Sequence, residues 1–416
     1  MLKVALIGNM NNNFFSVMRY FVDLSIDAHL YLFEDEISGS MSHFRPECDT
    51  WSINKWKDRI HILPVGRLYP WCFRNPITLK GHGSKRSLRQ IFRNYDITIG
   101  SGMTPSMFHH IGLKLSLFVP YSVGIEYYRN SEVINIRRGS NLVKKIMCHL
   151  VTRKQSKGIK ETVLCYNSDL GITKDSFNSL NKEFLNLSIP MVYNGDNPKE
   201  VNLRESLVQS KNRIKDSDFS VFSHSRHMWA KKSIKNTFDT KNNDWLIRAF
   251  AKFIRHSEVN AVLAIVEYGP DIGETKKLSE ELGISEKVIF LPMMDRKEIM
   301  YFLSICDIGV GEFCNKSVKM WGGTGWEVLS SGKPLLQSFH YTKEEYLNEF
   351  EHEAPPICVV NSEQDVLNHL TNLSENKAER DLIGNKSKEW FNKNNGIGLA
   401  RKWLKEIINK EILEQI

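Results

Sequence analysis

Short apolar runs alternate with stretches of helical periodicity along almost all of the 416-residue chain. An alternation of this kind is typical of strand–helix pairs that build parallel sheets. The pattern therefore favours an α/β fold. The apolar runs predict strands at Lys3–Ile7, Ala28–Phe33, Tyr95–Ile99, Leu115–Val119 and Thr162–Cys165 in the first half, and at Phe219–Phe222, Ala261–Val266, Val288–Leu291, Ile308–Val310, Pro334–Gln337 and Ile357–Val360 in the second.

Helical periodicity fills many of the gaps between these strands, and two doubly wound, Rossmann-like domains account for both series. The predicted division is 1–197 for the first domain, 198–217 for a polar connection, 218–395 for the second domain, and 396–416 for a helix that packs back on the first domain. Since ligands of doubly wound sheets bind at the carboxyl ends of the strands, we expect a central cleft there. The predicted helices are Phe15–Leu24, Pro105–Leu113, Asp244–Ile254, Gly273–Leu282, Lys297–Ser304, Gly325–Ser330 and Ser362–Leu373.

Composition is that of an ordinary globular protein, with 41% hydrophobic and 25% charged residues. The seven cysteines are scattered and form no CxxC pair, which argues against a disulfide framework or a structural zinc site. The first residues, MLKVALIGN, resemble a buried strand more than a signal peptide, and no apolar run is long enough for a membrane span. We therefore expect a cytoplasmic protein.

Positive charge is concentrated in one part of the first half. The net charge is +8, yet residues 51–160 alone carry twenty Lys and Arg against four Asp and Glu. Such a basic segment predicts an anionic partner, either nucleic acid or a membrane surface. In residues 141–154, NLVKKIMCHLVTRK, an apolar stripe with cations beside it favours peripheral contact with an anionic membrane over nucleic acid. A surface helix that packs on its own core would show the same pattern.

Two segments of the second half carry candidate chemistry. In VFSHSRHMWAKK, Arg226 and Lys231 follow a predicted strand, and together they suit a diphosphate. In WGGTGWEVLSSGKPLL, backbone amides of Gly323, Thr324 and Gly325 at a helix start suit a phosphate, and Glu327 in the first helical turn suits the vicinal hydroxyls of a ribose. Solvated loop cations, turn glycines and an acid favoured by the helix dipole are the plainer alternatives.

The segment 219–336 resembles the donor domain of retaining GT-B glycosyltransferases of the family-4 type. The matching blocks are SRHMWAKK with NDWLIRAFAKF, LAIVEYGPD, EELGISEKVIFLPMMDRKEIMYFLSICDIGV, and GTGWEVLSSGKPLL. The resemblance implies a GT-B fold in which Arg226 and Lys231 hold the donor diphosphate, the glycine loop lies by the phosphates and Glu327 binds the ribose. It also implies that backbone at Pro292, Met293 and Met294 lies near the nucleotide base. His224, beside Arg226, and Gly269 are further candidates to line the donor pocket. For His224, a satisfied loop histidine is the alternative.

The chain departs from this family at two places. Where the family carries a second glutamate eight residues before the ribose-binding one, this chain has Lys319, and Glu312 is the nearest acid upstream. Where relatives carry a histidine near the reaction centre, this chain has Tyr121. Glu126 lies just beyond and is a candidate to accept a proton or orient the acceptor, and a salt-bridged acid among surplus cations is the plainer alternative.

The loop after the first strand, Gly8 to Asn13, is rich in asparagine. By resemblance, Asn9, Asn11, Asn12 and Asn13 would lie near the donor or the acceptor. Asparagine also favours caps and turns, which explains the cluster without any ligand.

These features together predict a hexosyltransferase-type enzyme that moves a sugar from a nucleoside diphosphate sugar to a hydroxyl acceptor. The expected acceptors are a glycan, a glycolipid or a lipid-linked sugar, as in the assembly of a bacterial surface polysaccharide. No metal, other cofactor or nucleic acid partner is expected, because no cluster of carboxylates and histidines has metal-ligand spacing and basic residues can neutralise the leaving diphosphate. The alternatives are a GT-B-like nucleotide-sugar epimerase and a non-catalytic glycan-binding or assembly protein.

Overall fold

The computed structural model divides into two compact units. Unit 1 comprises Met1–Glu47, Ser52–Tyr193 and Ile397–Ile416, and unit 2 comprises Cys48–Trp51 and Asn194–Gly396. The structure describes residues 1–37, 42–63, 65–66, 73–75, 80–82, 84–120, 153–166, 184–185, 187–196, 201–230, 240–314, 319 and 322–413.

Unit 1 is built on a seven-stranded sheet with the order β10-β9-β8-β7-β1-β2-β3, in which every neighbouring pair is parallel. The interior strand β1 is buried along four of its five residues, as expected for a strand covered on both faces. The strands are β1 (Lys3–Ile7), β2 (Asp27–Phe33), β3 (Ile60–Leu63), β7 (Ile97–Gly100), β8 (Leu117–Phe118), β9 (Leu164–Tyr166) and β10 (Phe184–Leu185).

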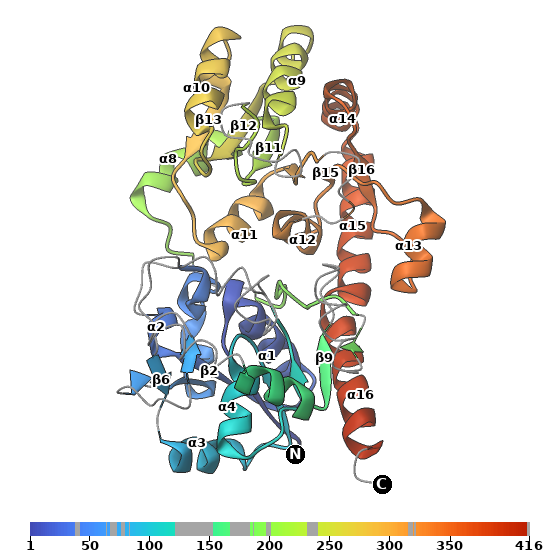
Figure 1. Ribbon diagram of the computed structural model, residues 1–416. Helices are drawn as coiled ribbons and strands as arrows, with labels where there is room; N and C mark the ends of the chain where they lie inside the picture. The colour runs from blue at the N-terminus through green and yellow to red at the C-terminus, as the bar shows by residue number, and fades with distance from the viewer. Residues whose placement is uncertain are drawn as a thin grey trace. The chain divides into compact units, whose positions relative to one another are not determined.

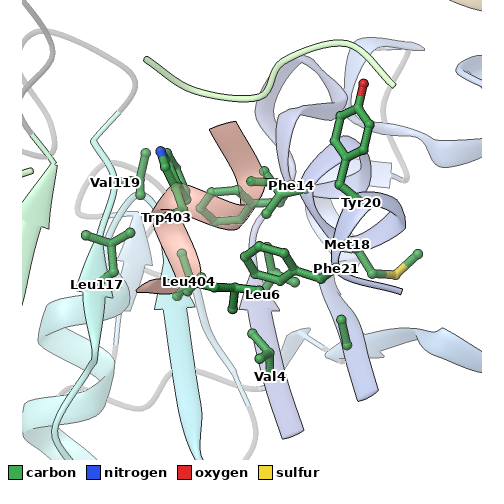
Figure 2. Close-up of a cluster of buried hydrophobic side chains, with 14 of the residues drawn as sticks. Val4, Leu6, Phe14, Met18, Tyr20, Phe21, Leu117, Val119, Trp403 and Leu404 are labelled. Atoms are coloured by element: carbon green, nitrogen blue, oxygen red, sulfur yellow. The ribbon is translucent and has the colours of Figure 1, made fainter. Parts of the chain in front are cut away.

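The helices of unit 1 include one from the far end of the chain. Helix α16 (Ile397–Leu413) packs against α1 (Asn13–Asp23), and Figure 2 shows Trp403 and Leu404 among Leu6, Phe14 and Phe21. Trp403 is completely buried and donates its indole N–H to the backbone oxygen of Ser188. The other helices are α2 (Glu34–Ile37), α3 (Lys85–Phe92) and α4 (Thr104–Ile111), and a small antiparallel sheet holds β4 (Val65–Gly66), β5 (Phe73–Asn75) and β6 (Lys80–His82).

Unit 2 has a six-stranded parallel sheet with the order β13-β12-β11-β14-β15-β16. The chain starts in the middle, adds strands on one side and then returns to add strands on the other, so the topological switch point lies between β11 and β14. The strands are β11 (Phe219–Ser223), β12 (Ala261–Val266), β13 (Val288–Leu291), β14 (Ile308–Val310), β15 (Leu335–Gln337) and β16 (Ile357–Val359).

Helices of unit 2 follow most of these strands (Figure 1). The apolar stripe of α9 and that of α14 are buried in one cluster with β11 and β12. Helix α11 begins with a capping box, in which Asp295 and Glu298 satisfy each other's backbone amides. The helices are α8 (Glu205–Lys215), α9 (Asn243–His256), α10 (Ile272–Glu281), α11 (Arg296–Ile305), α12 (Gly323–Ser330), α13 (Lys343–Phe350), α14 (Glu363–Glu375) and α15 (Lys377–Asn394).

Six short 3-10 helices complete the described elements: η1 (Met10–Asn12), η2 (Ser42–Phe44), η3 (Pro46–Cys48), η4 (Ile53–Lys55), η5 (Lys57–Arg59) and η7 (Ser285–Lys287).

The predicted α/β class with two doubly wound sheets is confirmed. The segment 198–217 differs from its prediction as a connection, because most of it is helix α8 and belongs to unit 2. Leu207 and Ile214 of α8 are buried, and Arg204 just before it donates two 2.7 Å hydrogen bonds to the carboxylate of Glu298. The two buried apolar residues of this helix lie seven apart, too few to reveal it in a polar sequence.

Candidate functional site

The candidate site lies at the carboxyl edge of the unit 2 sheet, beside the switch point. Ser223, the last residue of β11, pairs in register with Val310, the last residue of β14, so the loops after both strands begin side by side. His224 and Arg226 follow β11, Glu312 follows β14, and Glu327 lies on the helix that comes next. In doubly wound sheets this is the expected place for a ligand.

Glu327 lies at the centre of a chain of ionic contacts in unit 2. Its Oε2 lies 2.7 Å from Nε2 of His224, and its Oε1 accepts a 2.8 Å hydrogen bond from Nε of Arg296. Arg296 also donates a 3.1 Å hydrogen bond to Oδ1 of Asp49, which belongs to the short segment Cys48–Trp51 of unit 2. Helices α11 and α12, which carry Arg296 and Glu327, lie next to each other in Figure 1. Four segments of the chain thus build one largely buried network.

The charges of this network stabilise one another. Burial alone would raise the pKa of Glu327, but the hydrogen bond from His224 and the positive charge of Arg296 outweigh burial and hold that pKa below its usual value. Burial would likewise lower the pKa of Arg296, and the carboxylates of Asp49 and Glu327 raise it instead. Glu327 is therefore ionised at neutral pH, and since a carboxylate only accepts, Nε2 of His224 must carry the shared proton.

The position of Glu327 differs from the prediction in two respects. It is the fifth residue of α12, so it lies beyond the first turn. Its residue exposure is 7%, and each oxygen already accepts one hydrogen bond from within the protein. Each carboxylate oxygen can accept a second hydrogen bond, so the network limits the directions from which a ligand hydroxyl can approach.

Arg226 is exposed at the same edge, and its loop is held against the loop after β12. The amide of His227 donates to the backbone oxygen of Tyr268 at 2.7 Å, and the amide of Asp271 donates to the backbone oxygen of His227 at 3.2 Å. Gly269 lies between these contacts with φ +116°, and a Cβ there would lie 2.4–2.5 Å from backbone atoms of His227. Gly269 was predicted to contact the donor, and the structure shows that close backbone packing requires a glycine at this position.

The carboxylate of Asp271 holds the backbone of the residues that follow Arg226. Oδ2 of Asp271 accepts hydrogen bonds from the amides of Trp229, at 2.7 Å, and Ala230, at 2.9 Å. The indole N–H of Trp229 donates to Oγ1 of Thr275 on α10. Lys231, the second predicted cation, falls in residues 231–239, outside the described residues.

The amino end of α12 contains the predicted glycine loop. Gly323, Thr324 and Gly325 are the first three residues of the helix, and Oγ1 of Thr324 is buried without a hydrogen-bond partner. Gly322 caps the helix, and a Cβ there would lie 2.7 Å from Oε1 of Glu312. The first amides of a helix attract anions, so this end of α12 suits a phosphate.

Glu312 itself is held from two sides. Its Oε2 pairs with Nζ of Lys241 at 2.5 Å, and its backbone N–H and oxygen both bond to the side-chain amide of Gln337 at 2.9 Å. Lys319, which stands eight residues before Glu327, pairs with Glu345 on α13 at 3.0 Å. An acid therefore does lie at the start of α12, although it comes from the end of β14.

The predicted donor contacts Pro292, Met293 and Met294 follow β13. Pro292 and Met294 are partly buried and Met293 is 64% exposed. The backbone oxygen of Met293 accepts a 2.8 Å hydrogen bond from Arg204, so this oxygen already has a partner within unit 2.

In unit 1, the asparagine loop is tied into the fold. Nδ2 of Asn9 donates to Oδ1 of Asn12 at 2.7 Å and to the backbone oxygen of Phe44 at 2.8 Å. Oδ1 of Asn9 accepts the amide of Phe15 in the first turn of α1 at 2.9 Å. Capping explains Asn9 without a ligand.

Two of the neighbouring asparagines, Asn11 and Asn12, adopt the backbone conformation of the turn before α1. Asn11 and Asn12 both have φ 55°, a left-handed conformation that asparagine tolerates better than most residues. Asn13 is buried, and its Oδ1 has no hydrogen-bond partner. Tyr121 and Glu126 lie outside the described residues, as does most of the stretch 141–154.

Sequence reasoning missed Arg296, Asp49 and Lys241. Arg296 is the first residue of a helix and Asp49 lies between two 3-10 helices, so nothing local distinguishes either from a surface charge. Within the described residues, no group of three or more His, Cys, Asp or Glu is arranged to hold a metal ion. No described helix is long and apolar enough to cross a membrane.

Comparison with known proteins finds a family model that matches part of the second half. Residues 233–390 match the family model described as glycosyl transferases group 1. No curated protein matches the chain.

Solved structures resemble the whole chain in fold. A mutant of S. aureus TarM in complex with UDP has a TM-score of 0.55 at 12% identity, over 98% of this chain and 100% of the other. A glycosyltransferase from Rickettsia africae has a TM-score of 0.55 at 13% identity, over 100% and 99%. UDP-GlcNAc 2-epimerase from Neisseria meningitidis has a TM-score of 0.54 at 14% identity, over 98% and 100%. The chain therefore has the GT-B fold of these structures, and its residues 233–390 match the family model described as glycosyl transferases group 1.

Proposed function

We propose that the protein is a glycosyltransferase that moves a sugar from a nucleoside diphosphate sugar to a hydroxyl acceptor. The match of residues 233–390 to the glycosyl transferases group 1 family carries the proposal. The arrangement beside the switch point supports it, because an exposed arginine, a helix amino end and a fixed acid meet the needs of a diphosphate and its ribose. TarM and the Neisseria epimerase were crystallised with UDP and UDP-GlcNAc, so a uridine nucleotide is the first candidate donor.

In the proposed reaction, bond breaking at the anomeric carbon leaves negative charge on the diphosphate. Arg226, Lys231 and the first amides of α12 would stabilise this charge where it develops, and stabilisation of this kind usually contributes most to the lowering of the barrier. Glu327 would anchor the ribose, and the network of His224, Arg296 and Asp49 keeps its carboxylate ionised and oriented. Retention of anomeric configuration, a hexose as the sugar, and a role for Glu126 as base belong to the same proposal.

The acceptor is proposed to be a glycan, a glycolipid or a lipid-linked sugar of a bacterial surface polysaccharide. The basic segment 51–160 supports an anionic acceptor or peripheral contact with an anionic membrane. No metal or other cofactor is included, since basic side chains take over neutralisation of the leaving group.

Donor binding can be tested by thermal shift with UDP, GDP, ADP, CMP and TDP. One of these should raise the Tm of the parent, because a ligand at 100 times its Kd stabilises by about 2.7 kcal/mol. Arg226→Ala should remove this rise without lowering the Tm of the free protein, since the residue is exposed. Arg248→Ala, at a 43% exposed arginine on α9, is the matched control and should behave as the parent. Equal shifts in parent and Arg226→Ala would refute the site.

The activity itself needs a second experiment, because an epimerase shares the fold. The donor selected by the panel would be incubated alone and with acceptor extracts, and the nucleotide sugar analysed by chromatography. Transfer predicts free nucleoside diphosphate that depends on the acceptor. An isomerised nucleotide sugar in the absence of acceptor would identify an epimerase, and an unchanged donor would favour a binding protein.

A further inference from the structure

Two histidines of unit 1 face each other across neighbouring strands, and the proposed function uses neither. His29 lies on β2 and His61 on β3, and His61 pairs in register with Tyr31, so the three side chains lie on the same face of the sheet. Nδ1 of His29 lies 2.9 Å from Nε2 of His61. Both rings are partly exposed, that of His29 to 21%, so water reaches the pair.

The second contact of His29 fixes the position of its proton. Nε2 of His29 lies 3.2 Å from Oδ1 of Asp27, and the same oxygen accepts a 2.8 Å hydrogen bond from Nη1 of Arg59. Beside Arg59 this carboxylate is ionised, and an ionised carboxylate only accepts, so Nε2 of His29 carries a hydrogen. In the neutral ring, Nδ1 therefore presents its lone pair to His61.

The surroundings of the pair resemble those of metal-binding histidines. A histidine that ligates a metal almost always donates its other ring N–H to a carboxylate, a backbone oxygen or water, which fixes its tautomer and orientation. Asp27 does this for His29, and Arg59 in turn holds Asp27. Tyr31 stacks on the ring of His61, with centroids 4.8 Å apart, and supports its orientation.

His61 can present a lone pair as well. Its contact with His29 is its only hydrogen bond to a described residue, so its Nδ1 can carry the ring proton. While the two rings are hydrogen-bonded to each other, Nε2 of His61 donates to Nδ1 of His29. Once the proton of His61 has moved to its Nδ1, both facing nitrogens are unprotonated, as metal ligands must be.

The separation of the rings suits a tetrahedral ion. Zinc–nitrogen bonds of about 2.0–2.1 Å at the tetrahedral angle place two ring nitrogens about 3.3–3.4 Å apart. Each ring centroid lies about 1.1 Å behind its nitrogen, so the same ion requires centroids about 5.1–5.3 Å apart. The centroids of His29 and His61 are 5.1 Å apart. Rotation of the two rings can therefore admit an ion while the spacing of the strands stays the same.

We propose that His29 and His61 bind a divalent transition-metal ion such as Zn²⁺, with water as its remaining ligands. Imidazole nitrogen is a preferred ligand of such ions. The proton between the rings moves through solvent from Nε2 to Nδ1 of His61, and no other covalent bond changes. Only two side chains take part, so the ion exchanges more readily than one in a closed site with four protein ligands. The inference does not depend on the proposed function.

An ion between these histidines would cross-link an edge strand to the sheet. β3 is the last strand of the unit 1 sheet and pairs with β2 alone among the described strands of that sheet. A ligand that binds only the folded state stabilises it, so Zn²⁺ should raise the Tm of the full chain. Because both ligands come from β2 and β3, the rise should require both histidines.

Calorimetry with ZnCl₂ tests the site. The full chain, freed of metal by a chelator and then dialysed, would be titrated at about pH 7.5, where free imidazole is mostly neutral. His109→Gln is the matched control, since His109 is 25% exposed and also contacts a carboxylate, that of Glu161 at 2.8 Å. We expect one binding event in the parent and in this control that is absent from His29→Gln and His61→Gln. Asp27→Asn should weaken it about 10–100-fold, because the carboxylate orients a ligand.

The outcomes decide the inference without involving the donor site. Failure of the parent to bind Zn²⁺ would overturn it, and this measurement needs no variant to fold. Binding that persists undiminished in both His29→Gln and His61→Gln, or that disappears in His109→Gln, would overturn it as well, because the ion would then lie elsewhere. None of these results bears on the proposed function, which rests on residues of unit 2.

Discussion

Gly269→Ala should destabilise unit 2 because two backbone segments approach each other at this residue. Its φ of +116° lies where side-chain-bearing residues are strained by about 1–3 kcal/mol. The added Cβ would also lie 2.4 Å from the backbone oxygen of His227 and 2.5 Å from its nitrogen, and overpacking of this kind costs about 1–3 kcal/mol more. Even the lower sum, about 2 kcal/mol, should lower the Tm of a unit of this size by about 4–8 °C.

Thermal unfolding would be monitored by tryptophan fluorescence, because Trp229 lies two residues after His227, whose backbone the added Cβ would meet. Gly273→Ala is the matched control, because it lies four residues along in α10 and a Cβ there meets nothing within 4 Å. The control should be unchanged or more stable by up to about 1 kcal/mol. A Gly269→Ala protein as stable as this control would refute the close approach of the two loops, and with it the fixed position of Arg226.

Two further substitutions probe the ionic contacts of the site. Arg296→Met should cost about 3–5 kcal/mol in denaturant unfolding at neutral pH, because it leaves buried carboxylates uncompensated. Because the pKa of Glu327 is lowered in the folded protein, its ion pair contributes its full stability above the unfolded-state pKa, and this stability is lost as pH falls through the folded-state pKa. The variant lacks this ion pair, so it should lose less stability on acidification than the parent does. Gly322→Ala should lower the Tm through displacement of Glu312, whereas Gly323→Ala, with open space around its Cβ, should not; equal Tm values would contradict this placement.

Most of the unit 2 sheet was predictable because strands β11, β12, β14 and β15 are buried along their whole length. The strands Ala261–Val266, Val288–Leu291 and Ile308–Val310 are continuous apolar runs and were predicted to the residue. Strand β3 was missed because it lies at an edge, where Ile62 is 54% exposed and the pattern is weak. Helix α15 was missed because its sequence is largely polar and its buried residues are widely spaced.

The site was predictable only in part, because its contacts join distant segments. His224 and Glu327 were each selected from their local sequence, yet nothing local shows that residues 103 apart would meet. Arg296 and Asp49 are 247 apart, and each resembles an ordinary surface charge until the fold brings them together. The strand ends predict where a ligand binds, whereas the pairing of charges there depends on tertiary structure.

Helix α16 also has a consequence for the order in which the protein folds during synthesis. The core of unit 1 needs Trp403, Leu404 and Ile407, but residues 194–396 stand between them and the rest of that unit. At roughly 5–20 residues per second, translation of the intervening stretch takes about 10–40 s. During that time the nascent first unit exposes the apolar surface that α16 will cover. Its folding is therefore completed only after the second unit has left the ribosome, and this interval gives chaperones their best opportunity to bind.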